Sequence, residues 1–309
     1  MHNCTLQIAM PLLDVIDDSV TRAAGVSLRM LRLDKVHPLL SGNKWYKLRL
    51  NLEAARHQGH TTVLSFGGAY SNHLHALAAA GNLFGFRTIG VVRGELTQPL
   101  NPTLAFCREQ GMELHAISRT EYRSKTDGAF LAELTARFGD FFLVPEGGAN
   151  TAGVLGCTDI VRFLQWSSHS RDRHVMLACG TGATLAGMLA GLTVPCQITG
   201  FSVLKGGEFL THRVQEFLHE CGAADPGQWQ INTDWHFGGY GRVTNELLEF
   251  IRQFTRTTGI PLEPVYTGKM MFGLYSLLAQ GGIASGSEII AIHSGGLQGW
   301  NDNVVNIPT

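Results

Sequence analysis

The sequence lacks the paired cysteines that indicate a disulfide scaffold or a zinc site. Its six cysteines have no CxxC pair and no other paired spacing, which is typical of reduced thiols. At 309 residues the chain can bury an ample core, as one large body or as two domains, without disulfides. We therefore expect a cytosolic protein. The cysteines are Cys4, Cys107, Cys157, Cys179, Cys196 and Cys221.

The sequence also lacks an excess of either charge. It has 24 basic and 25 acidic residues, and no basic block is interleaved with aromatic residues. This pattern favours neither nucleic acid nor an anionic membrane, so the expected partner is a small molecule. Residues 1–18 contain no basic stretch and include Asp14, Asp17 and Asp18, so we expect neither a signal peptide nor a transit peptide.

One long stretch has no charged residue. Residues 175–204 lack Asp, Glu, Lys and Arg, and the stretch is longer than a membrane span requires. Five glycines and Pro195 interrupt it, however, which divides it into shorter elements. We expect a strand at 175–178, a helix at 183–192 and a second strand at 197–203, which together form a buried β-turn-α-β unit.

Short apolar runs and helical patterns alternate along the rest of the chain. Helical patterns occur at 45–58, 73–81 and 103–111. Strands that alternate with helices predict parallel sheets that are buried on both faces. The predicted fold class is therefore α/β, with two open parallel-sheet domains and flanking helices. The further strands are expected at 62–65, 88–92, 114–117, 141–144 and 289–292.

Four of these strands lie between residues 61 and 145, which is enough for a sheet of their own. We therefore expect a small domain at 56–152, inserted into a large domain that is formed by 1–55 and 153–309. A cleft between two such domains is the natural place for a ligand.

Several catalytic motifs are absent. No GxSxG elbow and no GxxxxGK[ST] loop occur, and Leu185 stands where a dinucleotide fingerprint needs its third glycine. His73 and His75 are two residues apart, so on a helix they would face different ways, and no further ligand completes a metal set. We predict no catalytic metal.

The first of three informative segments contains Lys44. This lysine follows Gly42-Asn43 and begins a helical run, so its side chain is held at the end of an element, where functional groups are often placed. A solvated lysine in a first helical turn is the alternative.

The second segment is a turn at 67–73, Gly-Gly-Ala-Tyr-Ser-Asn-His, between an apolar strand and an alanine-rich helix. Its free N–H groups and the polar side chains of Ser71 and Asn72 suit a carboxylate or a phosphate. An ordinary N-cap, with Ser71 or Asn72 closing the helix, is the alternative.

The third segment joins a buried strand to a helix of small residues. Its backbone amides can surround a phosphate at the start of that helix. Tight packing between strand and helix is the structural alternative. The segment consists of Gly180, Thr181, Gly182, Ala183 and Thr184.

Together the three segments indicate a site for pyridoxal phosphate. This cofactor needs an amine that binds its aldehyde, a glycine-rich nest for its phosphate, and polar groups for the substrate carboxylate. Tyr240 and Tyr266 both lie in glycine-flanked turns. Each could act as an acid or base in the cleft, or could be a hydrogen-bonded core tyrosine.

Six motifs in a fixed order resemble the 1-aminocyclopropane-1-carboxylate (ACC) deaminase and D-cysteine desulfhydrase family over nearly the whole chain. They are Gly-Asn-Lys, Gly-Gly-x-x-Ser-Asn-His, Val-Pro-Glu-Gly-Gly, Gly-Thr-Gly-x-Thr, Pro-Val-Tyr-x-Gly-Lys and His-Ser-Gly-Gly. The resemblance implies the tryptophan synthase β-type fold, known as PLP fold type II, a small amino-acid substrate and a homodimer.

The resemblance also implies roles for individual residues. Lys44 would bind the cofactor covalently and move protons, and Gly180 to Thr184 would hold the phosphate. Ser71, Asn72 and His73 would face the substrate carboxylate or the cofactor, with Asn72 against the cofactor ring. Tyr240 and Tyr266 would be the phenols of the cleft.

Two positions help to choose a reaction. Members that open ACC resemble each other in having Glu and Leu where this chain has Thr267 and Ser294. Thr267 or Ser294 could hydrogen-bond the pyridine nitrogen as an uncharged partner and weaken the electron sink, which suits α,β-elimination. Tyr70 and the stretch from Leu297 to Trp300 depart from the family pattern near the expected substrate pocket.

The leading hypothesis is therefore a pyridoxal phosphate-dependent lyase that eliminates sulfide from D-cysteine or a similar small D-amino acid, giving pyruvate and ammonia. Ring-opening deamination of ACC, to 2-oxobutanoate and ammonia, is the alternative. A third hypothesis is a non-catalytic relative that binds the cofactor or an amino acid. The presence of Lys44, Ser71, Tyr240 and Tyr266 argues against that third hypothesis.

Overall fold

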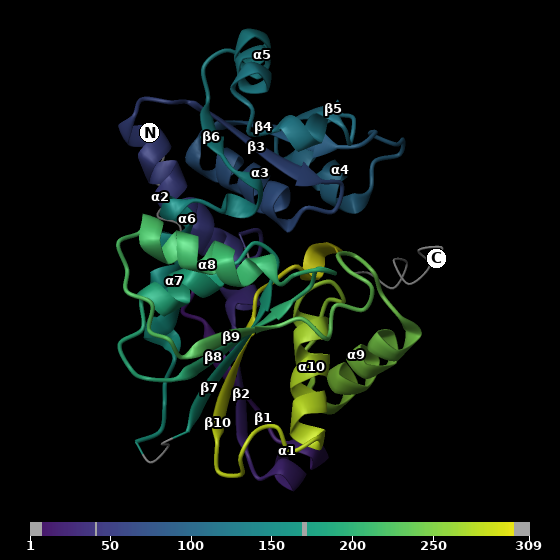
Figure 1. The fold of residues 1–309 in the computed structure, drawn as a ribbon. Helices are drawn as coiled ribbons and strands as arrows, with labels where there is room; N and C mark the ends of the chain where they lie inside the picture. Colours follow the sequence, from purple (N-terminus) through teal and green to yellow (C-terminus); the bar gives the residue numbers. More distant parts are fainter. Residues whose placement is uncertain (1–7, 41, 169–171, 300–309) are drawn as a thin grey trace.

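A computed structural model describes residues 8–40, 42–168 and 172–299. These residues form one sheet of six strands and one of four, and helices flank both sheets (Figure 1). Of the residues considered above, 1–7 with Cys4, and Trp300, lie outside the described part of the chain.

The four-stranded sheet is parallel throughout, in the order β5-β4-β3-β6. All four strands that were predicted between residues 61 and 145 belong to it. The division of the chain into domains at residues 56 and 152 stays a prediction. The strands are β3 (Thr62–Gly68), β4 (Arg87–Arg93), β5 (Glu113–Ile117) and β6 (Phe142–Val144).

The six-stranded sheet has the order β1-β2-β10-β7-β8-β9. Its expected parallel character is wrong at one edge, because β1 pairs antiparallel with β2. Only a six-residue helix lies between these two strands, which is short for the crossover that a parallel pair needs. The strands are β1 (Leu12–Ile16), β2 (Ser27–Arg32), β7 (Arg173–Cys179), β8 (Gln197–Ser202), β9 (Trp229–Asn232) and β10 (Glu288–His293).

The helices connect these strands and have the following bounds. They are α1 (Ser19–Ala24), α2 (Asn43–His57), α3 (Asn72–Phe84), α4 (Pro102–Glu109), α5 (Gly128–Phe138), α6 (Thr151–Cys157), α7 (Ala183–Ala190), α8 (Phe209–Glu220), α9 (Asn245–Thr258) and α10 (Thr267–Ala279). The predicted helices at 45–58, 73–81, 103–111 and 183–192 are all present, with ends that differ by up to three residues.

Both faces of the large sheet are buried, as the apolar runs predict. Along β10, Ile289 and Ala291 contribute to the core that contains residues of α9 and α10. Ile290 and Ile292 contribute to the opposite core, with residues of α7 and α8. Figure 1 shows these two pairs of helices on opposite sides of the sheet. The alternation follows because successive strand residues point to opposite faces.

The uncharged stretch at 175–204 is the predicted β-turn-α-β unit. It contains most of β7, the turn before α7, α7 itself and β8. Gly187 is needed inside α7 because a Cβ there would lie 2.3 Å from the carbonyl oxygen of Val154 in α6. No helix in the described residues is both long enough and apolar enough to cross a bilayer.

Candidate active site

A cavity of about 410 Å³ lies where the carboxyl ends of the two sheets face each other. In the small sheet the chain runs from β3 to β4 and β5, and then returns to β6 on the other side of β3. In the large sheet β10 likewise lies on the opposite side of β7 from β8. Ligands of open α/β sheets bind at such reversals, and here two reversals meet at one cavity.

Most of the residues predicted for the site line this cavity. Ala183 and Thr267 do not line it, and both are completely buried in the protein. The hydroxyl of Thr267 lies 3.4 Å from that of Ser294, so Thr267 stands behind a residue that reaches the cavity. The predicted residues that line it are Lys44, Ser71, Asn72, His73, Gly180, Thr181, Gly182, Thr184, Tyr240, Tyr266 and Ser294.

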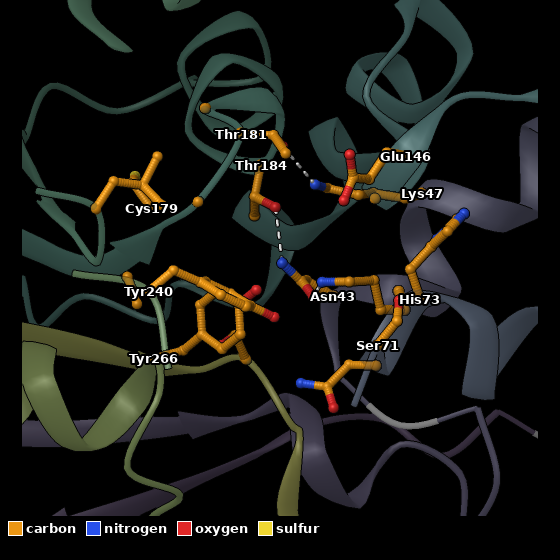
Figure 2. A pocket seen from close by; sticks show the side chains of 18 of the residues that line it. Asn43, Lys47, Ser71, His73, Glu146, Cys179, Thr181, Thr184, Tyr240 and Tyr266 are labelled. Atoms are coloured by element: carbon orange, nitrogen blue, oxygen red, sulfur yellow. Dashed lines mark hydrogen bonds between the residues drawn. The ribbon is translucent and has the colours of Figure 1, made fainter. Parts of the chain in front are cut away.

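Lys44 lies in the first turn of α2 and is held by its neighbours. Its Nζ donates to Oδ1 of Asn43 at 2.8 Å, and Nδ2 of Asn43 donates to Oγ1 of Thr184 at 2.8 Å (Figure 2). Burial, with a smaller contribution from the positive charge of Lys47, lowers the pKa of Lys44 to about 7. The lowered pKa makes the uncharged amine of Lys44 accessible near neutral pH, and an uncharged amine can act as a nucleophile.

Lys47 is a second lysine at the site, which the sequence analysis missed. Its side chain is 3% exposed, and its Nζ donates to Oγ1 of Thr181 at 3.3 Å (Figure 2). Its position three residues after Lys44 could have revealed it, because residues three apart share one face of a helix. Burial lowers the pKa of Lys47 as well.

The closeness of the two lysines gives a test of the Lys44 pKa. Replacing Lys47 with glutamine removes a neighbouring positive charge, so the pKa of Lys44 is expected to rise from about 7, yet to stay below 10.5 because burial persists. Competitive acetylation of the cofactor-free protein across pH, with mass spectrometry of the Lys44 peptide, measures this midpoint. Lys35→Gln, at an exposed position, is the control. An unchanged midpoint in the Lys47 variant would contradict the coupling.

The turn between β7 and α7 has the form of an anion cradle. Gly182 adopts φ 78° and ψ −20°, and α7 begins at the next residue with its amides directed toward the turn. A Cβ at Gly182 would lie 2.9 Å from Cγ2 of Val214, so the backbone needs glycine here. With the ammonium of Lys47 against Thr181, these features fit a phosphate group.

The turn between β3 and α3 contains the N-cap that was one of the two alternatives, and it also faces the cavity, so its role as an anion site stays a prediction. Ser71 caps α3 by accepting a hydrogen bond from the amide of Leu74 at 3.2 Å, and it also lines the cavity. Asn72 lines the cavity too, and its Oδ1 accepts a hydrogen bond from Nε2 of Gln298 at 2.7 Å. Gln298 belongs to the stretch from Leu297 to Trp300 that was expected to depart from the family pattern, and this contact orients the Asn72 side chain.

His73 is buried at the edge of the cavity. Its Nε2 lies 2.9 Å from Oγ of Ser65, and its Nδ1 has no partner within the described residues. Burial, followed by the charges of Lys44 and Lys47, lowers the pKa of His73 well below its usual range. His73 is therefore a neutral imidazole at physiological pH.

Tyr240 and Tyr266 lie together on the other side of the cavity from Ser71 and Lys47 (Figure 2). Their rings meet edge to face with centroids 5.9 Å apart. The ring centroid of Tyr266 lies 6.0 Å from Nζ of Lys44. Burial, and then the neighbouring Tyr240, raises the pKa of Tyr266 well above its usual value, so its phenol keeps its proton.

Two buried charges hold these tyrosines in place. The Glu263 carboxylate accepts hydrogen bonds from the amides of Val265 and Tyr266, at 2.7 and 3.0 Å, just before α10. The Lys269 ammonium donates to the carbonyl oxygens of His236 and Gly239, at 2.9 and 2.7 Å. Lys269 thereby fixes the turn that carries Tyr240.

The cavity also contains residues that no sequence argument had placed there. Arg93 at the end of β4 and Glu146 after β6 both line it. Glu146 belongs to the Val-Pro-Glu-Gly-Gly motif, which had contributed only to the resemblance, whereas no sequence signal singled out Arg93. In the part of the chain that is described, no group of three or more His, Cys, Asp or Glu side chains is arranged to hold a metal ion.

These features define a two-sheet α/β enzyme whose cavity offers a lysine with a lowered pKa, a phosphate cradle and paired phenols. A family model described as "Pyridoxal-phosphate dependent enzyme" matches residues 18–295. The chain therefore belongs to the family of pyridoxal phosphate-dependent enzymes, and its fold is the tryptophan synthase β-like fold of PLP fold type II.

Three individual proteins are similar to the chain. The bifunctional D-cysteine desulfhydrase/1-aminocyclopropane-1-carboxylate deaminase of Arabidopsis thaliana is 31% identical over 91% of this chain and 75% of its own length. The D-cysteine desulfhydrase of Yersinia enterocolitica is 29% identical over 86% of each chain. The crystal structure of an ACC deaminase homologue is 27% identical, with a TM-score of 0.84, and the match covers 95% of this chain and 91% of that one.

Proposed function

We propose that the protein is a pyridoxal phosphate-dependent lyase that performs α,β-elimination on a small D-amino acid such as D-cysteine, giving pyruvate, ammonia and sulfide. The observation that carries this proposal is the pair of hydroxyls of Ser294, which follows β10, and Thr267, which begins α10, 3.4 Å apart. An uncharged partner at the pyridine nitrogen keeps the electron sink weaker than a carboxylate would, which favours early loss of a good leaving group. Two of the similar proteins carry the name D-cysteine desulfhydrase.

The cofactor fits the cavity residue by residue. Lys44 would bind its aldehyde, and the turn from Gly180 to Thr184, with the Lys47 ammonium, would hold its phosphate. Asn72 and Ser294 would face its ring. When bound, pyridoxal phosphate withdraws electrons from the α-carbon of the amino acid and so acidifies the α-proton.

The side chains of the protein then supply positioning and proton transfer. Ser71 and Asn72 would bind the substrate carboxylate at the start of α3, where amides and hydroxyls converge. The Lys44 amine, whose pKa burial lowers to about 7, would take the α-proton. Tyr266 keeps its proton because burial raises its pKa, so it could hydrogen-bond the departing sulfur.

Deamination of ACC is the second candidate function. Its support is the Arabidopsis thaliana protein, whose name contains both activities. In that reaction the same lysine and phenols would serve ring opening instead of the loss of a leaving group. A protein that binds the cofactor or an amino acid without turnover is the third candidate.

Product analysis distinguishes the three functions. The holoenzyme is incubated separately with D-cysteine, L-cysteine and ACC, and sulfide, pyruvate and 2-oxobutanoate are measured. We expect sulfide and pyruvate in equal amounts from D-cysteine, at a kcat/KM higher than that for 2-oxobutanoate formation from ACC. The reverse order would favour the deaminase. No product from any of the three, with the cofactor bound, would contradict both enzyme functions.

We further propose a cytoplasmic homodimer. The cytoplasmic location is supported by the cysteines, since all five in the described residues are free thiols and four of them are buried. The homodimer rests on the family resemblance. Light scattering of the purified holoenzyme, which measures the molar mass directly, tests the assembly against the 33.6 kDa of one chain.

A further inference from the structure

A second cavity, of about 390 Å³, adjoins the first. We call it the vestibule, and two of its residues, Arg93 and Glu146, also line the active-site cavity. A single ligand could therefore extend from one cavity into the other. The vestibule is lined by Arg93, Arg119, Tyr122, Arg123, Lys125 and Glu146.

The vestibule lies at the carboxyl ends of the small sheet, beside the turn that carries Ser71. Arg93 ends β4 and pairs in register with Gly68 at the end of β3. A Cβ at Gly68 would lie 3.7 Å from Nη2 of Arg93, so this guanidinium lies against the start of the turn. Residues 119–125 follow β5, the next strand of the sheet. Carboxyl ends of parallel strands are the usual place for a ligand.

The charges of the vestibule are strongly unbalanced. Four cations line it, and its one carboxylate, Glu146, is engaged by Lys125 at 3.5 Å between Oε2 and Nζ. No ion pair of Arg93, Arg119 or Arg123 exists within the described residues. Three guanidinium groups around one hollow, without a carboxylate of their own, match the forked geometry that recognises an oxyanion.

A buried phenol gives a second and independent indication of a ligand. Tyr122 is only 3% exposed, and its hydroxyl makes no hydrogen bond of ordinary length among the described residues, although the nearby Glu146 carboxylate helps to raise its pKa. The Tyr122 ring is fixed edge to face against Phe66, with the cations of Arg93 and Lys125 at 5.5 and 4.9 Å from its centroid. The hydroxyl therefore has room for a better placed acceptor, which an oxyanion in the vestibule would supply beside the cations.

We propose that the vestibule binds a second acidic group of the amino-acid substrate, distal to its α-carbon. This proposal rests on the proposed function and specifies its substrate class: amino acids whose β-substituent ends in a carboxylate or another oxyanion. The α-carboxylate occupies the turn with Ser71, and the distal acid reaches past Arg93 to Tyr122, Arg119 and Arg123. Because Arg93 and Glu146 line both cavities, we assign the acid to the substrate and not to a separate ion.

Two compounds that differ only in charge test this assignment. S-(carboxymethyl)-D-cysteine has the distal acid, and S-(carbamoylmethyl)-D-cysteine has a neutral amide of the same length. Elimination breaks the Cα–H and Cβ–S bonds and releases the thiol, mercaptoacetate or its amide. The 2-aminoacrylate that remains is hydrolysed by water to pyruvate and ammonia. Where the holoenzyme releases pyruvate, kcat/KM gives the comparison, and where it does not, isothermal titration calorimetry gives Kd.

We expect the holoenzyme to bind the acid at least about tenfold more tightly than the amide, as charge-assisted hydrogen bonds predict. In the double variant Arg119→Gln, Arg123→Gln this ratio should fall toward one. The variant Arg108→Gln, Arg256→Gln loses the same net charge at exposed positions elsewhere and should retain the ratio. A ratio near one in the unmodified protein, or equal ratios in both double variants, would overturn the proposal.

Inorganic sulfate distinguishes the acid of a substrate from a free ion. Sulfate that competes with the acid but not with the amide supports the assignment. Sulfate that binds together with both compounds would make the vestibule a site for free anions and would overturn it.

Binding and turnover also separate the two proposals. A tenfold binding ratio without pyruvate contradicts only the lyase, whereas turnover of D-cysteine with a ratio near one contradicts only the vestibule.

Discussion

Replacing Lys44 with alanine is expected to lower turnover by about 10⁴-fold, because this substitution removes the proposed nucleophile and the proposed proton carrier together. The fold should remain intact. The pKa of Lys44 is lowered from 10.5 to about 7, which means that folding disfavours its charged form, and alanine removes that cost. Initial rates with D-cysteine and thermal unfolding of the cofactor-free protein measure the two effects.

The neighbouring lysine provides the control for this experiment. After borohydride reduction of the holoenzyme, peptide mass analysis should find the pyridoxyl adduct on Lys44 in the unmodified protein and in Lys47→Gln, and no adduct in Lys44→Ala. Lys47→Gln should instead weaken cofactor binding, because its Nζ lies 3.3 Å from Oγ1 of Thr181 in the proposed phosphate cradle. An adduct on Lys47 would reverse the assigned roles of the two lysines.

Gly42→Ala is expected to cost at least about 3 kcal/mol of unfolding free energy and to reduce turnover about 100-fold. Gly42 has φ 74° and ψ −161°, a region that essentially only glycine occupies. A Cβ there would also lie 2.0 Å from the carbonyl oxygen of Ser294. That oxygen accepts a hydrogen bond from the amide of Asn43 at 3.2 Å, so any displacement moves Lys44 relative to Ser294.

A second glycine with positive φ gives a comparison without a steric clash. Gly59 has a similar φ of 80°, but a Cβ there would have no heavy atom within 4 Å. Gly59→Ala should therefore cost about 1 kcal/mol, from strain alone, and should leave kcat unchanged. Chemical denaturation and steady-state kinetics of both variants give the comparison. Equal losses at the two positions would rule out the contact between Gly42 and Ser294 as the cause.

The alternation of strands and helices could be predicted because it is a local property of the sequence. The strands β3, β4, β5 and β6 and the unit at 175–204 follow from apolar runs that are bounded by turn residues. The antiparallel edge pair of β1 and β2 was missed, because pairing direction depends on the chain between two strands and not on the pattern within either.

The predicted site depended on turns whose chemistry is visible within a few residues. Lys44 after Gly42-Asn43, the turn with Ser71 and the turn from Gly180 to Thr184 are of this kind, and all three meet at the cavity. Ser294 lines the cavity, whereas Thr267 is buried with its hydroxyl 3.4 Å from that of Ser294, so its expected contact with the cofactor stays a prediction. A sequence motif identifies both residues as candidates, but it does not show which of the two side chains lines the cavity.

The sequence by itself determined the α/β architecture, the cofactor lysine as a candidate, and the glycine turn for a phosphate, because each rests on periodicity or on short-range spacing. Only the tertiary structure decided which distant groups share a cavity. Lys47 hydrogen-bonds Thr181, from which it is separated by 134 positions in the sequence. Gln298 hydrogen-bonds Asn72, from which it is separated by 226 positions. Arg93 reaches Gly68 only because β4 pairs with β3. Such contacts arise from the order of strands in the two sheets, which is a property of the folded chain and of no local segment.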